Sequence, residues 1–248
     1  MLIYVGCCGF ATSRKKYYQE YDVVELQDTF YNPPDEVKLK KLRSEAPEGF
    51  IFTMKAWQAI THPPYSATWR KCRIKIPKEL WNKYGFLRPT KENFDAWELI
   101  AAGAKSLNAR VVVIQSPPSF GYSKENYKNV VDFFSSITPA GFIIGWEARG
   151  SWREHPDKIK EIVEKFDDVI HITDPFRSEP ATLKGTNYFR LHGIGGKEVN
   201  YRYQYTDDDL SKLRDFIGKV NGREVYVLFN NIYMASDAKR FKAVLTKP

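Results

Sequence analysis

Acidic side chains and one histidine stand at or just after the ends of short apolar segments in this sequence. Glu25 lies near the end of VVELQ (23–27), Glu147 ends FIIGWE (142–147), and Asp174 ends VIHITD (169–174). His192 follows the apolar part of NYFRLHG (187–193). Carboxylates that lie close together or lose water can have widely different pKa values, which suits one for proton donation and another for proton acceptance. We therefore take these four residues as candidate catalytic groups.

Basic residues occupy equivalent positions and indicate an anionic ligand. Lys55, Arg149 and Arg190 can bind an anion, and arginine does so with two parallel hydrogen bonds. The loop HGIGG (192–196) is rich in glycine, so its backbone N–H groups are expected to approach a phosphate closely. The other candidate ligand-binding residues are His62, Gln115, Trp152, Gly193, Tyr203, Asn230 and Asn231.

Aromatic residues make up 15% of the chain and are interleaved with lysine and arginine near these segments. This mixture suits stacking on bases or sugars, although core packing explains many single aromatic residues equally well. The run YRYQY (201–205) favours stacking, because its three tyrosines alternate in a polar loop with no predicted strand to bury them.

The same polar residues have structural and metal-binding alternatives. A buried carboxylate is often half of an ion pair, and Glu25 with Arg190 or Glu147 with Lys55 are candidate pairs. The four candidate catalytic residues are also a potential ligand set for a divalent metal. Tight ligand spacing such as HxxxH is missing and the nearby cations would repel a metal, so we expect no metal and no cofactor. Cys7, Cys8 and Cys72 lack a zinc-site spacing and are interpreted as reduced thiols.

The elements that must position these residues alternate regularly along the chain. Eight apolar segments are nearly continuous in hydrophobicity, as strands buried on both faces of a parallel sheet require. The predicted strands are 2–6, 23–27, 50–55, 110–115, 142–147, 169–174, 187–193 and 224–231, and the predicted helices are 35–46, 91–108, 124–137, 155–166, 207–220 and 236–245. The pattern predicts an α/β fold, a (β/α)8 TIM barrel whose active site lies at the carboxyl ends of the strands.

Some connections depart from a regular barrel. The first holds only a short helix around residues 15–20, and residues 175–186 leave little room for one. The long insert between the third and fourth strands, residues 56–90, is expected to form a lid or an extended rim. Helix starts are predicted at Thr90, Ser123, Thr206 and Ser236 as N-caps. A doubly wound open sheet is the alternative, but no GxGxxG follows the first strand to support it.

Length and composition set the remaining expectations. With 248 residues, 43% of them hydrophobic, the chain is predicted to form one domain over residues 1–248. No apolar run approaches the roughly 18 residues of a membrane span, and the N-terminus resembles a first strand rather than a secretion signal, which predicts a cytoplasmic protein. The net charge of +8 favours phosphorylated small molecules or nucleic acid as partners, although a solvated basic surface explains it as well. The sequence gives no oligomeric state.

Six blocks in this order resemble the DUF72 family, also called YecE-like proteins: VELQDTFYNPP (24–34), PEGFIFTMKAWQAITH (47–62), QSPPSF (115–120), WEARGSW (146–152), YFRLHG (188–193) and VLFNN (227–231). The resemblance implies a barrel similar to those of endonuclease IV and xylose isomerase, and it implies no established activity. The family pattern falls on Glu25, Thr29, Phe30, Tyr31, Lys55, Thr61, His62, Gln115, Pro117, Pro118, Glu147, Arg149, Trp152, Asp174, Arg190, His192, Gly193, Asn230 and Asn231.

The chain departs from this family pattern in three places. Cys7 and Cys8 stand where the family has a hydroxyl-bearing GTSGW opening, and Gln27 stands where an asparagine is common. Ala148 and Gly150 replace the Phe and His of an EFRHPSW segment, which removes one candidate acid or metal ligand.

Three hypotheses of function follow from the sequence. The first is an enzyme, of the hydrolase or phosphodiesterase kind, that acts on a phosphate ester or glycosidic bond, with nucleic acid among its candidate substrates. The second is a non-catalytic DNA- or RNA-binding protein that uses the basic block at 69–78 and the tyrosine loop. The third is a sugar-phosphate isomerase or epimerase.

Overall fold

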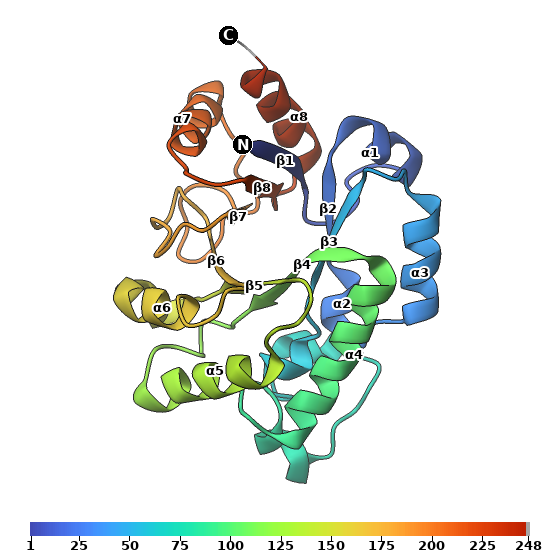
Figure 1. Cartoon of the computed structure of the whole chain (residues 1–248), viewed down its shortest axis with the longest axis vertical. Helices are drawn as coiled ribbons and strands as arrows, with labels where there is room; N and C mark the ends of the chain where they lie inside the picture. Colours follow the sequence, from blue (N-terminus) through green and yellow to red (C-terminus); the bar gives the residue numbers. More distant parts are fainter. Residues whose placement is uncertain (247–248) are drawn as a thin grey trace.

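A computed structural model describes residues 1–246 and shows eight parallel strands closed into a barrel (Figure 1). Each strand pairs with the next along the chain, and the first pairs with the last through six residues, Leu2 to Cys7 opposite Glu224 to Phe229. The strands are β1 (Leu2–Cys7), β2 (Val23–Leu26), β3 (Ile51–Lys55), β4 (Ala109–Gln115), β5 (Ile143–Glu147), β6 (Val169–Thr173), β7 (Thr186–Leu191) and β8 (Glu224–Phe229). The predicted TIM barrel and all eight predicted strands are confirmed.

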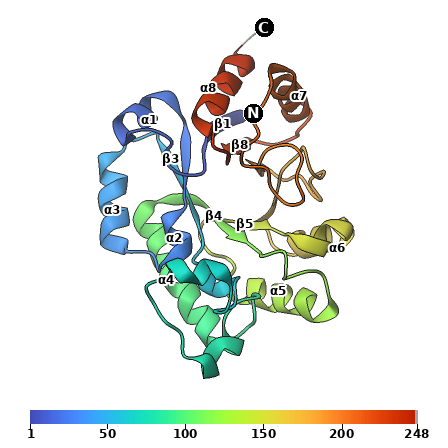
Figure 2. The same cartoon turned by 180° about the vertical axis from the view of Figure 1, so that it is seen from behind.

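Helices surround the barrel, as Figures 1 and 2 show from opposite sides. They are α1 (Arg14–Glu20), α2 (Asp28–Tyr31), α3 (Glu36–Glu45), α4 (Lys91–Leu107), α5 (Lys124–Ile137), α6 (Pro156–Val163), α7 (Asp207–Gly218) and α8 (Met234–Leu245). In the described chain β6 runs to β7 without a helix, as the short spacing predicted. The four-residue α2 directly after β2 was not predicted, because it is shorter than any periodic pattern.

The predicted helix starts are correct in three of the four cases. The side chains of Thr90, Ser123 and Thr206 each accept a hydrogen bond from the backbone N–H three residues later. The fourth prediction is wrong, because α8 begins at Met234 with Tyr233 as its N-cap. Ser236 lies inside the first turn, where its hydroxyl donates to the carbonyl of Tyr233 at 2.9 Å.

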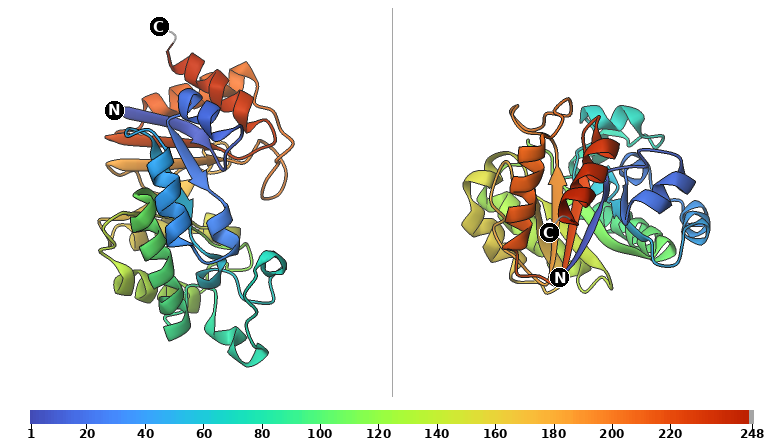
Figure 3. Two further views of the ribbon diagram at one scale, coloured as in Figure 1. Left: turned by 90° about the vertical axis from the view of Figure 1, so that its right-hand side faces the viewer. Right: turned by 90° about the horizontal axis from the view of Figure 1, so that it is seen from above.

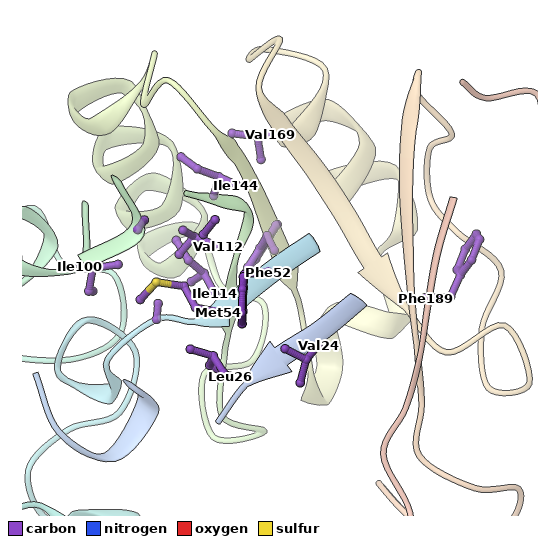
Figure 4. Close-up of a cluster of buried hydrophobic side chains, with 14 of the residues drawn as sticks. Val24, Leu26, Phe52, Met54, Ile100, Val112, Ile114, Ile144, Val169 and Phe189 are labelled. Carbon is purple, nitrogen blue, oxygen red and sulfur yellow. The ribbon is translucent and has the colours of Figure 1, made fainter. Parts of the chain in front are cut away.

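Side chains alternate between the two faces of each strand, and the outward-facing ones form the main core against the helices. Figure 4 shows Met54 and Ile114 from neighbouring strands beside Ile100 of α4. A second, smaller cluster that includes Val23, Ile170 and Tyr188 belongs to the opposite faces of their strands. The barrel interior is therefore a packed core.

Polar residues lie two positions after members of this interior cluster, on the same faces of the same strands. Glu25 comes two residues after Val23, and Arg190 comes two residues after Tyr188. Because residues i and i+2 of a strand share a face, the alternation directs both side chains into the barrel mouth.

The insert between β3 and β4 contains three short 3-10 helices, at Gln58–Ile60, Ala67–Lys71 and Lys78–Lys83. The buried Asn93 fixes the end of the insert, where the chain returns to the barrel. Its side-chain amide accepts a hydrogen bond from the N–H of Gly85 and donates one to the carbonyl of Gly85, both at 3.1 Å. Figure 3 shows the insert and the loop after β7 projecting from the same side of the barrel. The insert is therefore an extended rim of the mouth, one of the two forms that the sequence predicts.

None of the helices within residues 1–246 combines the length and the apolar character that a bilayer span requires.

Candidate active site

Arg190, near the end of β7, is the centre of the polar cluster in the mouth. Its guanidinium is fully buried and binds Glu25 through two hydrogen bonds, of 2.9 Å and 2.8 Å. The same group donates to Gln115 at 3.1 Å and to Glu147. Burial by itself would lower the pKa of Arg190, but the two carboxylates outweigh this effect and hold the pKa well above its ordinary value. Arg190 therefore joins β2, β4, β5 and β7.

Glu25 is saturated with hydrogen bonds. One carboxylate oxygen accepts from Arg190 and Gln27, and the other accepts from Arg190 and the hydroxyl of Tyr188. A carboxylate has about four acceptor positions, and all of them are used here in a side chain with no exposed surface. This bonding matches the predicted Glu25–Arg190 pair, and it favours a positioning role over the acid–base role that the sequence suggested.

Glu147, at the end of β5, lies between two arginines. It bonds Arg190 through one carboxylate oxygen and Arg149 Nε through the other, at 2.6 Å. Burial would raise the pKa of Glu147, but the charges of Arg149 and Arg190 hold it well below the ordinary value. The predicted pairing of Glu147 with Lys55 is wrong, because the arginines take that place.

Asp174 and His192 form the neighbouring part of the cluster. The Asp174 carboxylate accepts from the backbone N–H of His192 at 2.8 Å, and His192 Nε2 lies 3.2 Å from Arg149 Nη2. Because arginine only donates, His192 Nε2 must accept, which assigns the ring proton to Nδ1 on the side of Asp174. Burial lowers the pKa of His192, so the ring is neutral. Its contacts orient Arg149.

In the glycine loop, the backbone N–H of Gly193 is not available to a phosphate. The N–H of Gly193 already donates to the hydroxyl of Tyr205 at 2.8 Å. The carbonyl oxygens of Gly193 and Gly195 both accept from Arg177 at 2.6 Å. The prediction for Gly193 is therefore wrong in its chemistry, although the loop does lie at the mouth.

Lys55, at the end of β3, differs from the other cations in the mouth. Its ammonium lies 3.8 Å from the centroid of the Phe30 ring, and within residues 1–246 no carboxylate pairs with it. Burial, together with the charges of Arg190 and Arg149, lowers the pKa of Lys55 to about 7. Phe30 also contacts His62 edge-on, and burial with the Lys55 charge lowers the pKa of His62 to about 3. Lys55 is therefore the side chain of this group whose charge changes near neutral pH.

Several predicted ligand-binding residues have other partners. Trp152 is fully buried against Trp146, with ring centroids 5.0 Å apart, so its prediction as a binding residue is wrong. The amide of Asn231 donates to the buried Asp237 at 2.8 Å, which joins it to α8. Asn230 is half-buried, and its N–H bonds the carbonyl of Leu191 at 2.9 Å.

The tyrosine loop is divided between core and surface. Tyr205 is buried at 1% exposure, which contradicts the prediction that this loop cannot bury its tyrosines. Tyr203 is half-buried, and its hydroxyl donates to Asp209 at 2.7 Å. Tyr201 is the exposed member, and its ring centroid lies 6.3 Å from that of His192. Tyr201, rather than the predicted Tyr203, is therefore the tyrosine of this loop that lies beside His192.

Sequence reasoning missed Tyr188 as a member of the cluster. Tyr188 donates to Glu25 at 2.8 Å and lies 2.8 Å from the hydroxyl of Thr53. The signal was present, because Tyr188, Arg190 and His192 alternate along one strand and must share its inner face. Gln27 carries the same signal, because it lies two residues after Glu25, to which it donates a hydrogen bond.

A small cavity lies within the cluster. A cavity of about 10 Å3 lies beside Glu147, Asp174 and His192, close to the minimum that one water molecule needs. Among the described residues, no three His, Cys, Asp or Glu side chains are grouped as a metal ion would require. That the site works without a metal or cofactor stays a prediction.

Comparisons with known proteins agree with this architecture. The family model described as "Protein of unknown function DUF72" matches residues 8–247. The UPF0759 protein YunF of Bacillus subtilis is 26% identical over 268 residues, covering 93% of this chain and 89% of the relative.

Two solved DUF72 structures share the fold. One, from Enterococcus faecalis, has a TM-score of 0.73 at 20% identity and covers 100% of this chain and 96% of its own. The other, from Thermotoga maritima, has a TM-score of 0.71 at 21% identity and covers 100% of both chains. The chain therefore belongs to the DUF72 family of uncharacterised TIM-barrel proteins.

Proposed function

We propose that this protein is an enzyme that acts on an anionic, phosphate-bearing substrate at the carboxyl-terminal mouth of its barrel. The observation that carries the proposal is the Lys55 ammonium, which lies in the mouth near Arg149 without a carboxylate partner in the described chain. Glu25 and Glu147 are balanced by Arg190 and Arg149, so these four charges cancel. Lys55 adds the net positive charge to which an anion would bind.

Lys55 also supplies a proton at the right pH. A general acid or base works best when its pKa lies near the operating pH, and the pKa of Lys55 is about 7. In our proposal Lys55 donates its proton to the leaving oxygen of a phosphate ester or glycosidic bond. Arg149, which Glu147 holds in place, binds the anion, and the neutral Lys55 amine left by this transfer accepts the proton of the attacking water. Arg190 and Glu25 hold these groups in position from deeper in the barrel.

The other hypotheses have less support at this site. An isomerase of the metal-dependent kind draws none from the described residues, among which no ligand cluster is present. Non-catalytic nucleic-acid binding does not account for a buried lysine with this pKa beside a polar cluster.

Thermal unfolding in the presence of candidate anions tests the proposal. We expect inorganic phosphate, nucleotides or phosphorylated sugars to raise the melting temperature of the wild type, and Lys55→Met to abolish the shift. Lys219→Met, an exposed change after α7, is the matched control and should retain it. An anion that stabilises wild type and Lys55→Met equally would refute the assignment. Any stabilising class then defines the esters or glycosides to assay for turnover.

A further inference from the structure

A groove outside the barrel mouth runs beside α2 and α3 and reaches the insert. Its volume is about 880 Å3, within the range of ligand-binding sites. Leu26, Leu39 and Leu42 contribute buried apolar surface, and residues 71, 73 and 74 of the insert form another side. Thr29 also lines the groove and donates to the Lys55 carbonyl at 2.6 Å, so the groove adjoins the mouth.

The rim of the groove is cationic. Five lysines and arginines line it against three acidic residues, which leaves a net charge of about +2 at neutral pH. Arg14 and Lys38 are paired with carboxylates of the same groove. Over residues 1–246, Lys41, Lys71 and Arg73 form no ion pair and are exposed. Three cations are therefore available to an anionic ligand that lies along the groove.

Two aromatic rings accompany these cations. Phe10 follows β1 and Tyr31 ends α2, and both are half-buried in the groove wall. Lys71 Nζ lies 4.7 Å from the Tyr31 ring centroid, and the Arg14 guanidinium lies 5.7 Å from that of Phe10. Each ring thus lies next to a positive charge. Aromatic rings interleaved with cations are what single-stranded nucleic acids use, through base stacking and phosphate contacts.

We propose that this groove binds a single-stranded nucleic acid, with Lys41, Lys71 and Arg73 on its phosphodiesters and Phe10 and Tyr31 against its bases. A duplex does not fit this chemistry, because its bases are already stacked and the apolar groove floor would meet only backbone. An acidic peptide would satisfy the cations but not the rings. Because Thr29 adjoins both sites, a strand in the groove extends into the mouth beside Lys55. This last step rests on the proposed function, whereas binding in the groove does not.

Fluorescence anisotropy with labelled oligothymidylate of about 15 nucleotides tests the proposal directly. Lys71→Glu/Arg73→Glu reverses two exposed rim charges, and we expect it to weaken binding at least about tenfold at low salt. Lys41→Glu on α3 is an independent single variant and should weaken binding in the same direction. Lys165→Glu/Lys219→Glu is the matched control, because both lysines are exposed on the loops that lead into β6 and β8 at the opposite end of the barrel. It makes the same charge change and should leave affinity within about twofold.

A second experiment tests whether bases stack on the two aromatic rings. An abasic oligomer of equal length keeps the phosphates but offers nothing to Phe10 and Tyr31, so we expect it to bind at least about tenfold more weakly. Oligouridylate, measured beside oligothymidylate, tells whether the chain prefers RNA or DNA. Equal affinity for the abasic oligomer, or equally strong competition by polyglutamate, would overturn the proposal in favour of a general polyanion surface.

The same variants separate this inference from the proposed function. Suppose the rim variants bind the oligomer as the wild type does while Lys55→Met still loses its stabilisation by phosphate. The groove inference then fails and the proposed function stands. If the rim variants lose the oligomer while phosphate never stabilises the wild type, the groove stands and the proposed function fails. Unchanged thermal unfolding of each variant without ligand shows that folding is not the cause.

Discussion

Arg190 and Glu25 are 165 residues apart in the sequence and form a two-bond ion pair with no exposed surface on either side chain. Burying two charges is unfavourable, and the pair persists because Glu25 accepts four hydrogen bonds and Arg190 also donates to Gln115 and Glu147. The first prediction follows from this balance.

Replacing Arg190 by methionine should destabilise the fold by about 3–5 kcal/mol, because Glu25 would stay buried without its counter-charge and Glu147 would keep only Arg149. Urea denaturation measures the loss. The double variant Glu25→Gln/Arg190→Met removes the unpaired charge and should recover part of the lost stability. Equal stability of the single variant and the wild type would mean that water reaches the cluster.

Lys55→Met should be more stable than the wild type at neutral pH. The pKa of Lys55 is about 7 in the folded protein against an ordinary 10.5. Between these values the unfolded chain keeps a proton that the folded protein has released, so wild-type stability rises by about 1.4 kcal/mol per pH unit. Lys55→Met lacks this rise, so its advantage should be largest below pH 7 and vanish near pH 10.5. Denaturation of both proteins across this range measures the difference, and an advantage that does not change with pH would contradict the lowered pKa.

Anion affinity should fall as the pH rises above 7, whereas the stability of the wild type rises over the same range. An anion binds the charged form of Lys55, so its dissociation constant should rise about tenfold per pH unit above pH 7. Sulfate is the suitable probe, because its own charge is constant over this range. Calorimetric titration at several pH values measures the effect, and Lys55→Arg, which keeps its charge, should show a flat profile.

Tyr188→Phe should cost about 1–3 kcal/mol, since it removes a donor to Glu25 and leaves the buried Thr53 hydroxyl without that partner. Phenylalanine keeps the ring, so packing is nearly unchanged. Tyr201→Phe is the control at an exposed position and should be neutral in stability. Thermal unfolding of the two variants side by side separates the buried hydroxyl from the exposed one.

Gly85→Ala should loosen the insert. Gly85 has a φ of +77°, and a Cβ there would lie 2.5 Å from the backbone nitrogen of Pro63. The backbone conformation alone costs about 1–3 kcal/mol for a non-glycine residue. We expect faster proteolysis between residues 56 and 90 than in the wild type. Gly49→Ala, which meets nothing within 4 Å, is the control for the substitution itself.

Much of the fold was predictable because its signals are local. The strand around Val112 is continuous in apolar residues, and Thr90, Ser123 and Thr206 cap the helices that follow them. The prediction for Ser236 was wrong because a serine that lies inside the first turn of a helix looks the same in the sequence as a serine that precedes the helix. The short α2 has no periodicity to detect.

The sequence predicted which residues belong to the site, but not which of them form ion pairs with each other. Strand ends pointed to Glu25, Glu147 and Arg190, yet nothing in the sequence tells which cation meets which carboxylate. Arg149 meets Glu147 because it lies only two residues further along the chain, whereas the pair of Arg190 with Glu25 depends on how strands far apart in the sequence are placed in the barrel. Trp152 and Tyr205 were assigned to the mouth because burial of a loop residue depends on contacts far away in sequence.

The bonds that Arg190 makes to three other strands also bear on how a ligand would enter. Because the guanidinium fixes Glu25, Gln115 and Glu147 at once, the floor of the mouth has its final shape before any ligand arrives. Little conformational entropy then remains to be lost there on binding, and the ordering cost is confined to Lys55 and the exposed Tyr201. Preorganisation of this kind makes the binding free energy sensitive to the geometry of the anion more than to the adaptability of the protein.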